Sequence, residues 1–490
     1  MYNAVPGRDT EKLPLSMAHC PAVTGVLCAG VYQDGAVDGS ILRGIFMEFT
    51  VDYRVEDYIL NTKWDSFPDN IRERAVVCGI DLMMALIIGS KGGQFAAGTR
   101  LAKKIGALGE IAAVGTAETY NLLGAAIAMS HASNSFDIDD GHNMIKGHPG
   151  TSFVAGILAA GLEKDISYRE YLTVLVTAYE TSIRWAKAMQ NHYGYLHSTG
   201  AYGAYGTAAG AGRILGLDRA QLNNALSIAD FHAPMTPVMR SVEYPSMNKD
   251  GVPFGSLVGM TAVLETLAGS SGVGNILEMP EYRGLTETLG SDYEIMNLYF
   301  KPYTCCRWAH QPIAACVDLM EEHGFDGEDV ELVEVHTFDS AARLSKKIPE
   351  SADEAQYNIA WPVASALVFG DVGFKQVHES ALGNPKVLDM MKRLKFSVDE
   401  EIDRQFPAKR LAWVSIKMKD GREYRSRVYE APGEHTDHVD LKWITDKFMR
   451  ITKPMLKPED QTEIIRRLSN DLDAPLRSQV AGINQMLGVQ

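Results

Sequence analysis

The sequence predicts a mainly α protein with a large all-helical domain, a smaller α+β lid domain and C-terminal helices that return to the helical domain. Apolar residues recur at helical spacing from about Val55 to Gly269. Two later segments, Val330–Phe338 and Trp413–Val428, alternate like strands. After Asp437 the pattern is helical again. We therefore expect a helical domain over 51–284, a lid domain over 285–435, a returning segment over 436–490 and an N-terminal extension over 1–50.

The first half of the chain carries clear helix signals. Ile71–Gly89 widens into an apolar run that stops at glycine, which predicts a buried helix with a glycine C-cap. Ala117–Ala132 is rich in alanine and leucine and predicts another helix. Ser167–Glu170 and Asp218–Gln221 have the spacing of capping boxes and predict two further helix starts.

Small residues dominate residues 198–216 and 251–269. Small side chains let helices approach closely, so both segments predict tightly packed central helices. The glycine spacing in the first of them superficially resembles a nucleotide loop, but no strand-like run precedes it, which argues against a dinucleotide fold.

The lid domain is predicted from turn and strand signals. Asp420-Gly421 lies between two alternating segments and predicts a hairpin. Helices are expected near Ala360–Val368 and Pro385–Leu394, and Pro458 predicts a later helix start.

Composition and charge exclude several classes of protein. Among the 490 residues, 62 are acidic and 47 basic, which gives a net charge of −15 and argues against a nucleic-acid or anionic-membrane surface. No charge-free apolar run of membrane-spanning length appears, and the N-terminus lacks the features of a signal peptide. The six cysteines form no disulfide framework, and reduced thiols fit a cytoplasmic enzyme. An anionic substrate would need cations concentrated at its site.

Histidine and aspartate gather between two predicted helices. His131, Asp137, Asp139, Asp140 and His142 are followed closely by His148. Such a segment could hold a divalent metal ion. It could instead perform acid–base chemistry with a histidine oriented by an aspartate. It could also be an exposed loop with aspartate helix caps.

Five segments in the same order resemble one family. They are SFDIDDGHNMIKGHPGTSFVAGILA, GYLHSTGAYGAYGTAAGAGRILGL, MNKDGVPFGSLVGMTAVLETLAG, YFKPYTCCRWAHQPIAAC and AQYNIAWPVASAL. Together they resemble the motifs of the MmgE/PrpD family over about residues 55–470. That family includes 2-methylcitrate dehydratase, cis-aconitate decarboxylase and an iminodisuccinate epimerase. Residues 1–50 have no counterpart.

The resemblance implies a set of site residues. Asp137, His148, Lys249 and Lys301 fall on catalytic positions, with His148 as a proton-transfer residue, and His310 falls on the histidine after the cysteine pair. Lys249 also precedes a predicted helix N-terminus, where backbone N–H groups favour an anion. Both lysines could instead be solvated, as most lysines are.

Three further residues are candidates for substrate binding, each with a structural alternative. Arg184 follows Glu180 by four residues, so it forms either a helix ion pair or a carboxylate clamp. The same choice is open for Arg307. His197 precedes a predicted helix, so it either caps the helix or contacts the substrate.

Two positions depart from the family pattern. Gly141 stands where the family has a threonine, and Trp361 stands where it has a tyrosine. An indole can donate a hydrogen bond but cannot transfer a proton as a phenol does. Both positions are therefore expected in the substrate pocket, with chemistry that differs from the family pattern. These two differences raise the weight of the epimerase alternative.

The resemblance implies a cofactor-independent lyase without metal that dehydrates a hydroxylated di- or tricarboxylic acid of the 2-methylcitrate type. The alternatives are an epimerase or isomerase, a decarboxylase, or a catalytically silent binding protein on the same scaffold. The expected partners are a small anionic carboxylate substrate and a second copy in a homodimer, with no nucleic acid and no membrane.

Overall fold

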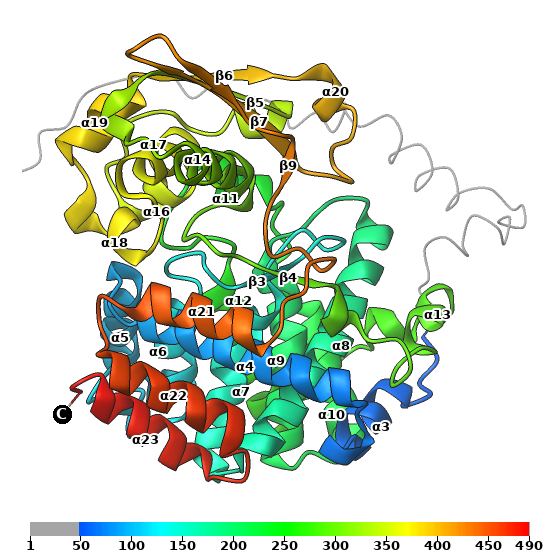
Figure 1. Ribbon diagram of the computed structural model, residues 1–490. Helices are drawn as coiled ribbons and strands as arrows, with labels where there is room; N and C mark the ends of the chain where they lie inside the picture. Colours follow the sequence, from blue (N-terminus) through cyan, green and yellow to red (C-terminus); the bar gives the residue numbers. More distant parts are fainter. Residues whose placement is uncertain (1–48, 490) are drawn as a thin grey trace, which may run out of the picture. The chain divides into compact units, whose positions relative to one another are not determined.

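The computed structural model describes residues 49–489, so nearly all of the predicted extension lies outside the described residues. The first part of the described chain is helical, and α9 packs against α7, α8, α10 and α12 (Figure 1). Two short strands, β1 (Leu108–Ala112) and β2 (Thr119–Tyr120), pair beside it. The helices are α3 (Arg54–Asn61), α4 (Asp69–Gly89), α5 (Gly93–Lys104), α6 (Leu122–Ser133), α7 (Pro149–Lys164), α8 (Tyr168–Tyr193), α9 (Thr199–Leu215), α10 (Arg219–Phe231), α11 (Met239–Glu243), α12 (Val252–Leu267) and α13 (Arg283–Thr286).

The second part combines a sheet with helices. Its strand order is β6-β5-β7-β8, with β9 also paired to β7. β5 and β6 are parallel and the other pairs are antiparallel. Helices α14 (His310–His323) and α17 (Ala360–Phe369) pack against each other, and α14 also packs on β7. The strands are β5 (Val330–Thr337), β6 (Leu394–Val398), β7 (Leu411–Met418), β8 (Glu423–Arg425) and β9 (Tyr429–Glu430).

Shorter helices connect these elements, and the chain then returns to its helical part. The connecting helices are α15 (Asp339–Ala342), α16 (Ala352–Gln356), α18 (Phe374–Val377), α19 (Pro385–Met391) and α20 (Glu400–Asp403). Helices α21 (Leu441–Thr452) and α22 (Pro458–Asn470) contact α4, whereas α23 (Leu476–Met486) contacts α7, α8 and β1. The predicted mainly α fold with a smaller α+β part and returning C-terminal helices is confirmed.

Several helix boundaries differ from the prediction. Gly89 is the last helical residue of α4 and abuts Ala132 of α6, so it allows a close helix contact and is not a left-handed cap. The helix predicted from Ala117 begins at Leu122, because residues before it form β2 and Asn121 is the N-cap. The helix predicted through Leu394 ends at Met391, and Leu394 starts β6.

The capping boxes also differ from each other. Both halves form around Asp218 and Gln221. At the start of α8, Ser167 accepts a hydrogen bond from the Glu170 backbone, but the Glu170 side chain pairs with Arg213.

The segment after residue 284 contacts the helical part before it reaches the sheet. Strand β4 (Leu298–Phe300) pairs with β3 (Asp140–His142), which lies between α6 and α7. The domain boundaries at 284 and 435 stay a prediction, but this pairing joins the two parts of the chain at the place where the polar loop lies.

Among the described residues no single helix is long and apolar enough to span a membrane. Helices α4 and α5 meet the length and composition criteria only as a pair, bent by 81°.

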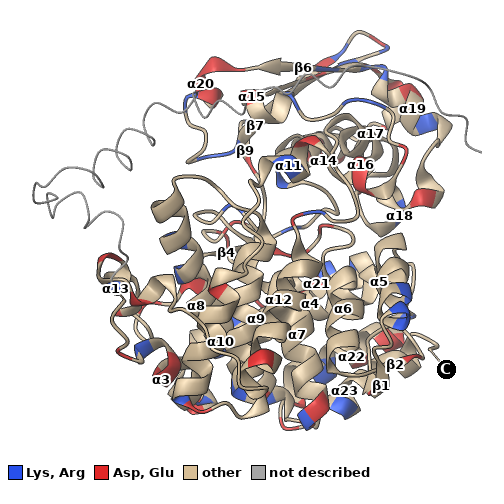
Figure 2. Cartoon of the chain, turned by 180° about the vertical axis from the view of Figure 1, so that it is seen from behind, with Lys and Arg blue, Asp and Glu red and all other residues tan. Residues whose placement is uncertain are grey.

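Close approach of small residues organises the helical core. Figure 2 shows that α7, α9 and α12 are almost free of charged residues. A Cβ atom added to Gly255 of α12 would lie 2.2 Å from the Gly200 carbonyl oxygen of α9. This contact is between backbones, so no side chain can move aside, and the predicted tight packing of the small-residue helices is confirmed.

Gly255→Ala should therefore destabilise the protein. Overpacking typically costs about 1–3 kcal/mol, and we expect a lower melting temperature in thermal denaturation. The matched control is Gly284→Ala, where an added Cβ meets no atom within 4 Å. A Gly255→Ala variant as stable as wild type would show that α9 and α12 can separate without loss.

Candidate active site

The candidate active site is built on the loop between α6 and α7. Strand β3 pairs with β4, and the His142 backbone N–H donates to the Gly147 carbonyl at 2.9 Å, which closes the end of the loop on itself. His148 then occupies the N-cap of α7, with Pro149 as the first helical residue. Proline favours that position because its missing N–H would have no helical partner there.

This loop places three carboxylates in the protein interior. Asp137, Asp139 and Asp140 are each at most 1% exposed. The Asp140 side chain accepts hydrogen bonds from the Tyr179 hydroxyl at 2.5 Å and from the Gly150 backbone at the start of α7. Burial raises the pKa of Asp140 to about 7. Buried carboxylates need charged or hydrogen-bonding partners. Asp139 obtains them nearby, from Asn134 and His148, and Asp137 from the distant Lys301.

Two buried lysines donate hydrogen bonds to the loop. The Lys301 ammonium, directly after β4, donates to Asp137 Oδ1 at 2.7 Å and to the Asp137 carbonyl at 3.2 Å. Burial alone would lower the pKa of Lys301, but Asp137 and Asp139 raise it. From α21, Lys447 donates to Asp81 at 2.5 Å and to the Ile138 carbonyl at 2.8 Å. The loop is thus fixed from both the β4 side and the C-terminal helices.

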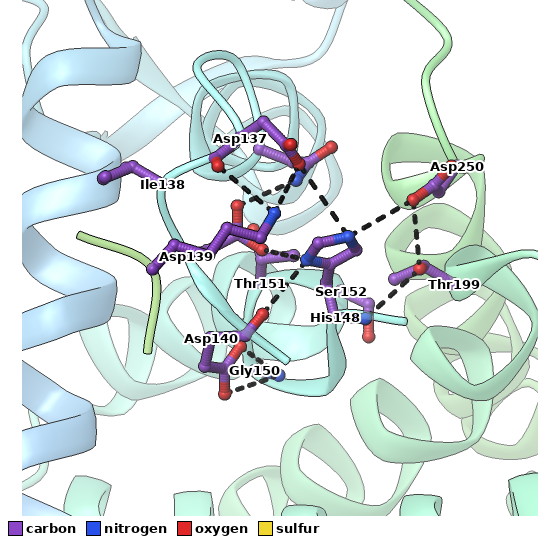
Figure 3. A network of polar contacts seen from close by, with 12 residues as sticks. Asp137, Ile138, Asp139, Asp140, His148, Gly150, Thr151, Ser152, Thr199 and Asp250 are labelled. Atoms are coloured by element: carbon purple, nitrogen blue, oxygen red, sulfur yellow. Dashed lines mark hydrogen bonds and ion pairs between the residues drawn. The ribbon is translucent and has the colours of Figure 1, made fainter. Parts of the chain in front are cut away.

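His148 is the centre of the polar network in Figure 3. Its Nδ1 lies 3.1 Å from Asp139 Oδ2 and 3.0 Å from the Asp140 carbonyl. Its Nε2 lies 3.6 Å from Asp250 Oδ2 and 3.8 Å from Asp137 Oδ1. Nδ1 forms its hydrogen bond with the Asp140 carbonyl, and the Asp139 carboxylate lies beside Nδ1 as its ion-pair partner. Asp139 therefore orients the ring by charge, whereas Asp137 lies on the Nε2 side.

The charges of the pair are mutually stabilising. Burial and the Lys301 ammonium would lower the pKa of His148, but Asp139 and Asp137 hold it above its usual value. Burial would raise the pKa of Asp139, but His148 and Lys301 hold it below its usual value. The arrangement favours an imidazolium, which can donate a proton through Nε2.

Asp250 faces the imidazole from the opposite side (Figure 3). It lies in the turn before α12, where Lys249 and Gly251 both have positive φ. Its Oδ2 accepts a hydrogen bond from Thr199 at 3.4 Å, and its Oδ1 has no hydrogen-bond partner among the described residues. Burial raises the pKa of Asp250, which makes its carboxylate a stronger base.

A cavity of about 300 Å³ opens beside this network. It is lined by His148, Asp137, Asp250 and several cations, together with apolar side chains from α11, the lid and the loop before β7. The lining residues are Asp137, Lys146, His148, Leu196, Val238, Met239, Val242, Asp250, Tyr299, Lys301, Cys306, Arg307, Trp308, Ser340, Tyr357, Phe406, Pro407 and Arg410. A small ligand with negative charge fits this mixture of cations and apolar walls.

Four of the predicted site residues line the cavity, namely Asp137, His148, Lys301 and Arg307. Lys249 lies next to Asp250 but does not line it, and its ammonium instead contacts the Gln356 side chain and lies 3.7 Å from Asp353. The Gln356 amide in turn donates to the Ser135 carbonyl at 3.2 Å. Lys249 therefore connects to the site loop through Gln356.

The two departures from the family pattern have structural reasons. A Cβ atom on Gly141 would lie 2.2 Å from the Tyr299 ring, its cross-strand partner, so Gly141 makes room for a tyrosine that lines the cavity. Trp361 is fully buried and donates to the Gln376 carbonyl, away from the cavity. The cavity nevertheless has a phenol from the same motif, because Tyr357 lines it.

Three other candidates lie outside the cavity. Arg184 is buried and pairs with Glu180, while its remaining donors reach Leu285, Asp292 and Thr288. The helix ion pair is thus the alternative that forms. His197 is buried beside the Trp185 and Tyr202 rings. His310 is buried and its Nε2 contacts the Cys305 carbonyl, while burial and Arg307 hold its pKa well below the usual value.

A divalent metal ion in this site would compete with ion pairs that its ligands already form. Asp137, Asp139 and His148 offer ligand atoms within 4.8 Å of one another. The Lys301 ammonium already binds Asp137, and His148 Nδ1 contacts Asp139. A divalent ion would have to replace both interactions, so these residues fit proton transfer better than metal binding.

Sequence reasoning named Asp139 in the polar segment without giving it a role of its own, and it missed Asp250, Tyr299, Tyr357, Lys146 and Arg410. Asp250 directly follows a predicted residue, and Asp139 and Lys146 lie within the polar segment already singled out. The sequence therefore marks the segments that contain these residues, but it does not show which way each side chain points. Arg410 carries no local signal, because only the tertiary fold brings it to the loop.

Asp139→Asn should lower the pKa of His148, because the neutral amide no longer stabilises the imidazolium. The imidazolium form should then be lost at lower pH than in wild type. Histidine Cε1–H NMR titration measures this, with His148→Asn used to assign the signal. Asp326→Asn, at an exposed position in the lid, is the control. An unchanged titration in Asp139→Asn would contradict the orienting role of Asp139.

Comparison with known proteins identifies the family of this chain. The MmgE/PrpD N-terminal domain model matches residues 54–295, and the MmgE/PrpD C-terminal domain model matches residues 303–471. Cis-aconitate decarboxylase of Aspergillus terreus is 22% identical over 409 residues, covering 76% of this chain and 83% of that protein. The cis-aconitate decarboxylase-like protein oryM of Aspergillus oryzae is 23% identical, covering 74% and 86%. Cis-aconitate decarboxylase of Mus musculus is 21% identical, covering 53% and 56%. The chain belongs to the MmgE/PrpD family.

Proposed function

We propose that this protein is a cofactor-independent lyase that removes water from a hydroxylated di- or tricarboxylic acid of the 2-methylcitrate type. The observation that carries the proposal is the pair formed by His148 and Asp250. An acid and a base 3.6 Å apart face one cavity that also holds cations. Elimination of water needs one group to accept a proton from carbon and one to donate a proton to the leaving hydroxyl.

The raised pKa values of His148 and Asp250 support the following division of roles. The Asp250 carboxylate takes the proton from the carbon next to the substrate carboxylate. The electron pair left on that carbon forms the double bond as the neighbouring C–O bond breaks. The His148 imidazolium gives its Nε2 proton to the departing oxygen, which leaves as water. Protonated Asp250 and neutral His148 are then neighbours, and proton transfer between them restores the starting state.

Lys301 supports the charged transition state. Abstraction of the α-proton places negative charge on the substrate carboxylate, and a fixed cation at the cavity wall stabilises that charge. Because Lys301 is held by Asp137 and is fully buried, little reorganisation is needed when the charge develops. The reaction so described requires neither a metal nor an organic cofactor.

Decarboxylation is the second candidate, and the relatives named cis-aconitate decarboxylase favour it. In that reaction the C–C bond to one carboxylate breaks, carbon dioxide leaves and the carbanion takes the His148 proton. Asp250 has no necessary part in that sequence. Epimerisation would use both groups, but would return the proton to carbon without breaking the C–O bond. The homodimer expected from the family resemblance stays a prediction.

Proton NMR of the purified protein in deuterated water, with chelator and 2-methylcitrate, citrate, cis-aconitate or iminodisuccinate, separates these reactions. We expect an alkene signal from a hydroxy acid. A terminal alkene formed from cis-aconitate would instead identify a decarboxylase, and deuterium exchange without elimination an epimerase. No reaction with any of the four acids would contradict the proposed substrate type.

His148→Asn should reduce the observed rate by about 10²–10⁴-fold, the usual contribution of a general acid or base. Asp250→Asn should reduce dehydration to a similar extent and decarboxylation far less. The control is His323→Asn, at an exposed position in the lid. Activity of His148→Asn within twofold of wild type would exclude the proposed proton donor.

A further inference from the structure

Two cations in the cavity lack an ionic partner. The other two are already neutralised, Lys301 by Asp137 and Arg307 by Glu434 at 2.7 Å. Lys146 and Arg410 form no ion pair with any residue from 49 to 489. The cavity therefore holds two positive charges in excess of those paired within it, although the whole chain has a net charge of −15.

These two side chains are held beside each other. The Lys146 ammonium donates to the Pro407 carbonyl at 3.3 Å, and the Arg410 guanidinium donates to Asn143 Oδ1 at 2.5 Å. Two hydrogen bonds thus connect the loop before His148 to the segment before β7. Arg410 also contributes to lowering the pKa of Lys146, as expected for neighbouring cations.

Arg410 has no direct ion pair with a described residue, and Glu434, on which its charge acts at longer range, already pairs with Arg307. Arg410 is 8% exposed, and its Nε has no hydrogen-bond partner among the described residues. A buried charge without a counter-charge is strongly unfavourable. A guanidinium fork matches the two oxygens of a carboxylate, and the neighbouring ammonium adds a third donor group.

We propose that Lys146 and Arg410 form a second carboxylate subsite, which binds a carboxylate of the substrate remote from the reacting carbon beside His148. The inference rests on the proposed function and assigns two residues to a second carboxylate of its di- or tricarboxylic substrate. The apolar part of the cavity wall includes Val242, Trp308 and Phe406. This wall suits the hydrocarbon frame that joins the carboxylates.

The binding test uses inert acids and does not depend on turnover. Isothermal titration calorimetry measures the affinity of tricarballylate, succinate and butyrate for wild type, Lys146→Met and Arg410→Met. Loss of one hydrogen-bonded charge pair should weaken tricarballylate and succinate by about 10- to 100-fold. Butyrate, with one carboxylate, should change by less than threefold.

Three controls make the result specific. Lys409→Met removes an exposed cation next to Arg410 and should bind all three acids like wild type. Arg410→Lys keeps a positive charge, so it should bind tricarballylate more tightly than Arg410→Met does but less tightly than wild type. Circular dichroism and melting temperature show which variants are folded, and Lys146→Met keeps the test possible if Arg410→Met does not fold, because Lys146 is only half-buried.

The pH dependence of binding gives an independent readout. Burial and Arg410 lower the pKa of Lys146 to about 8, with Glu434 opposing. The ammonium is charged below that pH, so affinity for tricarballylate should fall as the pH rises through about 8. His148 and the carboxylates Asp137 and Asp250 face the same cavity, so the decisive comparison is Lys146→Arg, whose guanidinium stays charged and should remove this decrease.

The outcomes separate the subsite from the proposed reaction. Wild-type affinity for tricarballylate in both Lys146→Met and Arg410→Met would overturn the subsite, as would failure of wild type to bind either polycarboxylate. Selective weakening in these variants supports the subsite even if wild type turns over none of the tested acids. The same binding pattern measured in His148→Asn would show that the subsite acts without the proton donor.

Discussion

The need to neutralise buried negative charge governs the structure around the candidate site. The loop between α6 and α7 turns Asp137 and Asp139 into the protein interior, where carboxylates are unstable without partners. Lys301 and His148 supply positive charge directly, and Lys447 secures the loop backbone while pairing with Asp81. Segments distant in sequence thus meet because each contributes one part of a charge-balanced cluster.

The two sides of the cavity have different chemistry. The helical side carries His148 and Asp250, whose proton affinities are shifted by burial and by neighbouring charges. The side completed by the segment before β7 carries Arg410, next to Lys146 of the site loop. An acidic protein can therefore admit an anion, because two cations without an ion-pair partner line this cavity while its acids are mostly paired.

Local sequence predicted much of the fold because helix periodicity and caps are short-range features. The capping box at Asp218 and the small-residue helices are examples. The site was predictable where a motif names a residue, as for His148 and Lys301. It was not predictable where the direction of a side chain decides, as for Lys249, which turns to Gln356 while its neighbour Asp250 faces the cavity. Arg410 depends on a tertiary contact with Asn143 that no local pattern contains.

Left-handed backbone conformations also concentrate around the site. Asp137, Lys146 and Lys249 have φ values of 50°, 53° and 40°. For residues with a Cβ atom this conformation costs about 1–2 kcal/mol each. Glycine at any of them would relieve the strain but remove a charged side chain from the site or its support. At Asp137 glycine would also leave the buried Lys301 ammonium without its counter-charge, which costs more than the strain. Lys146 forms no ion pair with a described residue, so there stability alone favours glycine, and the lysine records stability given up to keep a charge at the cavity.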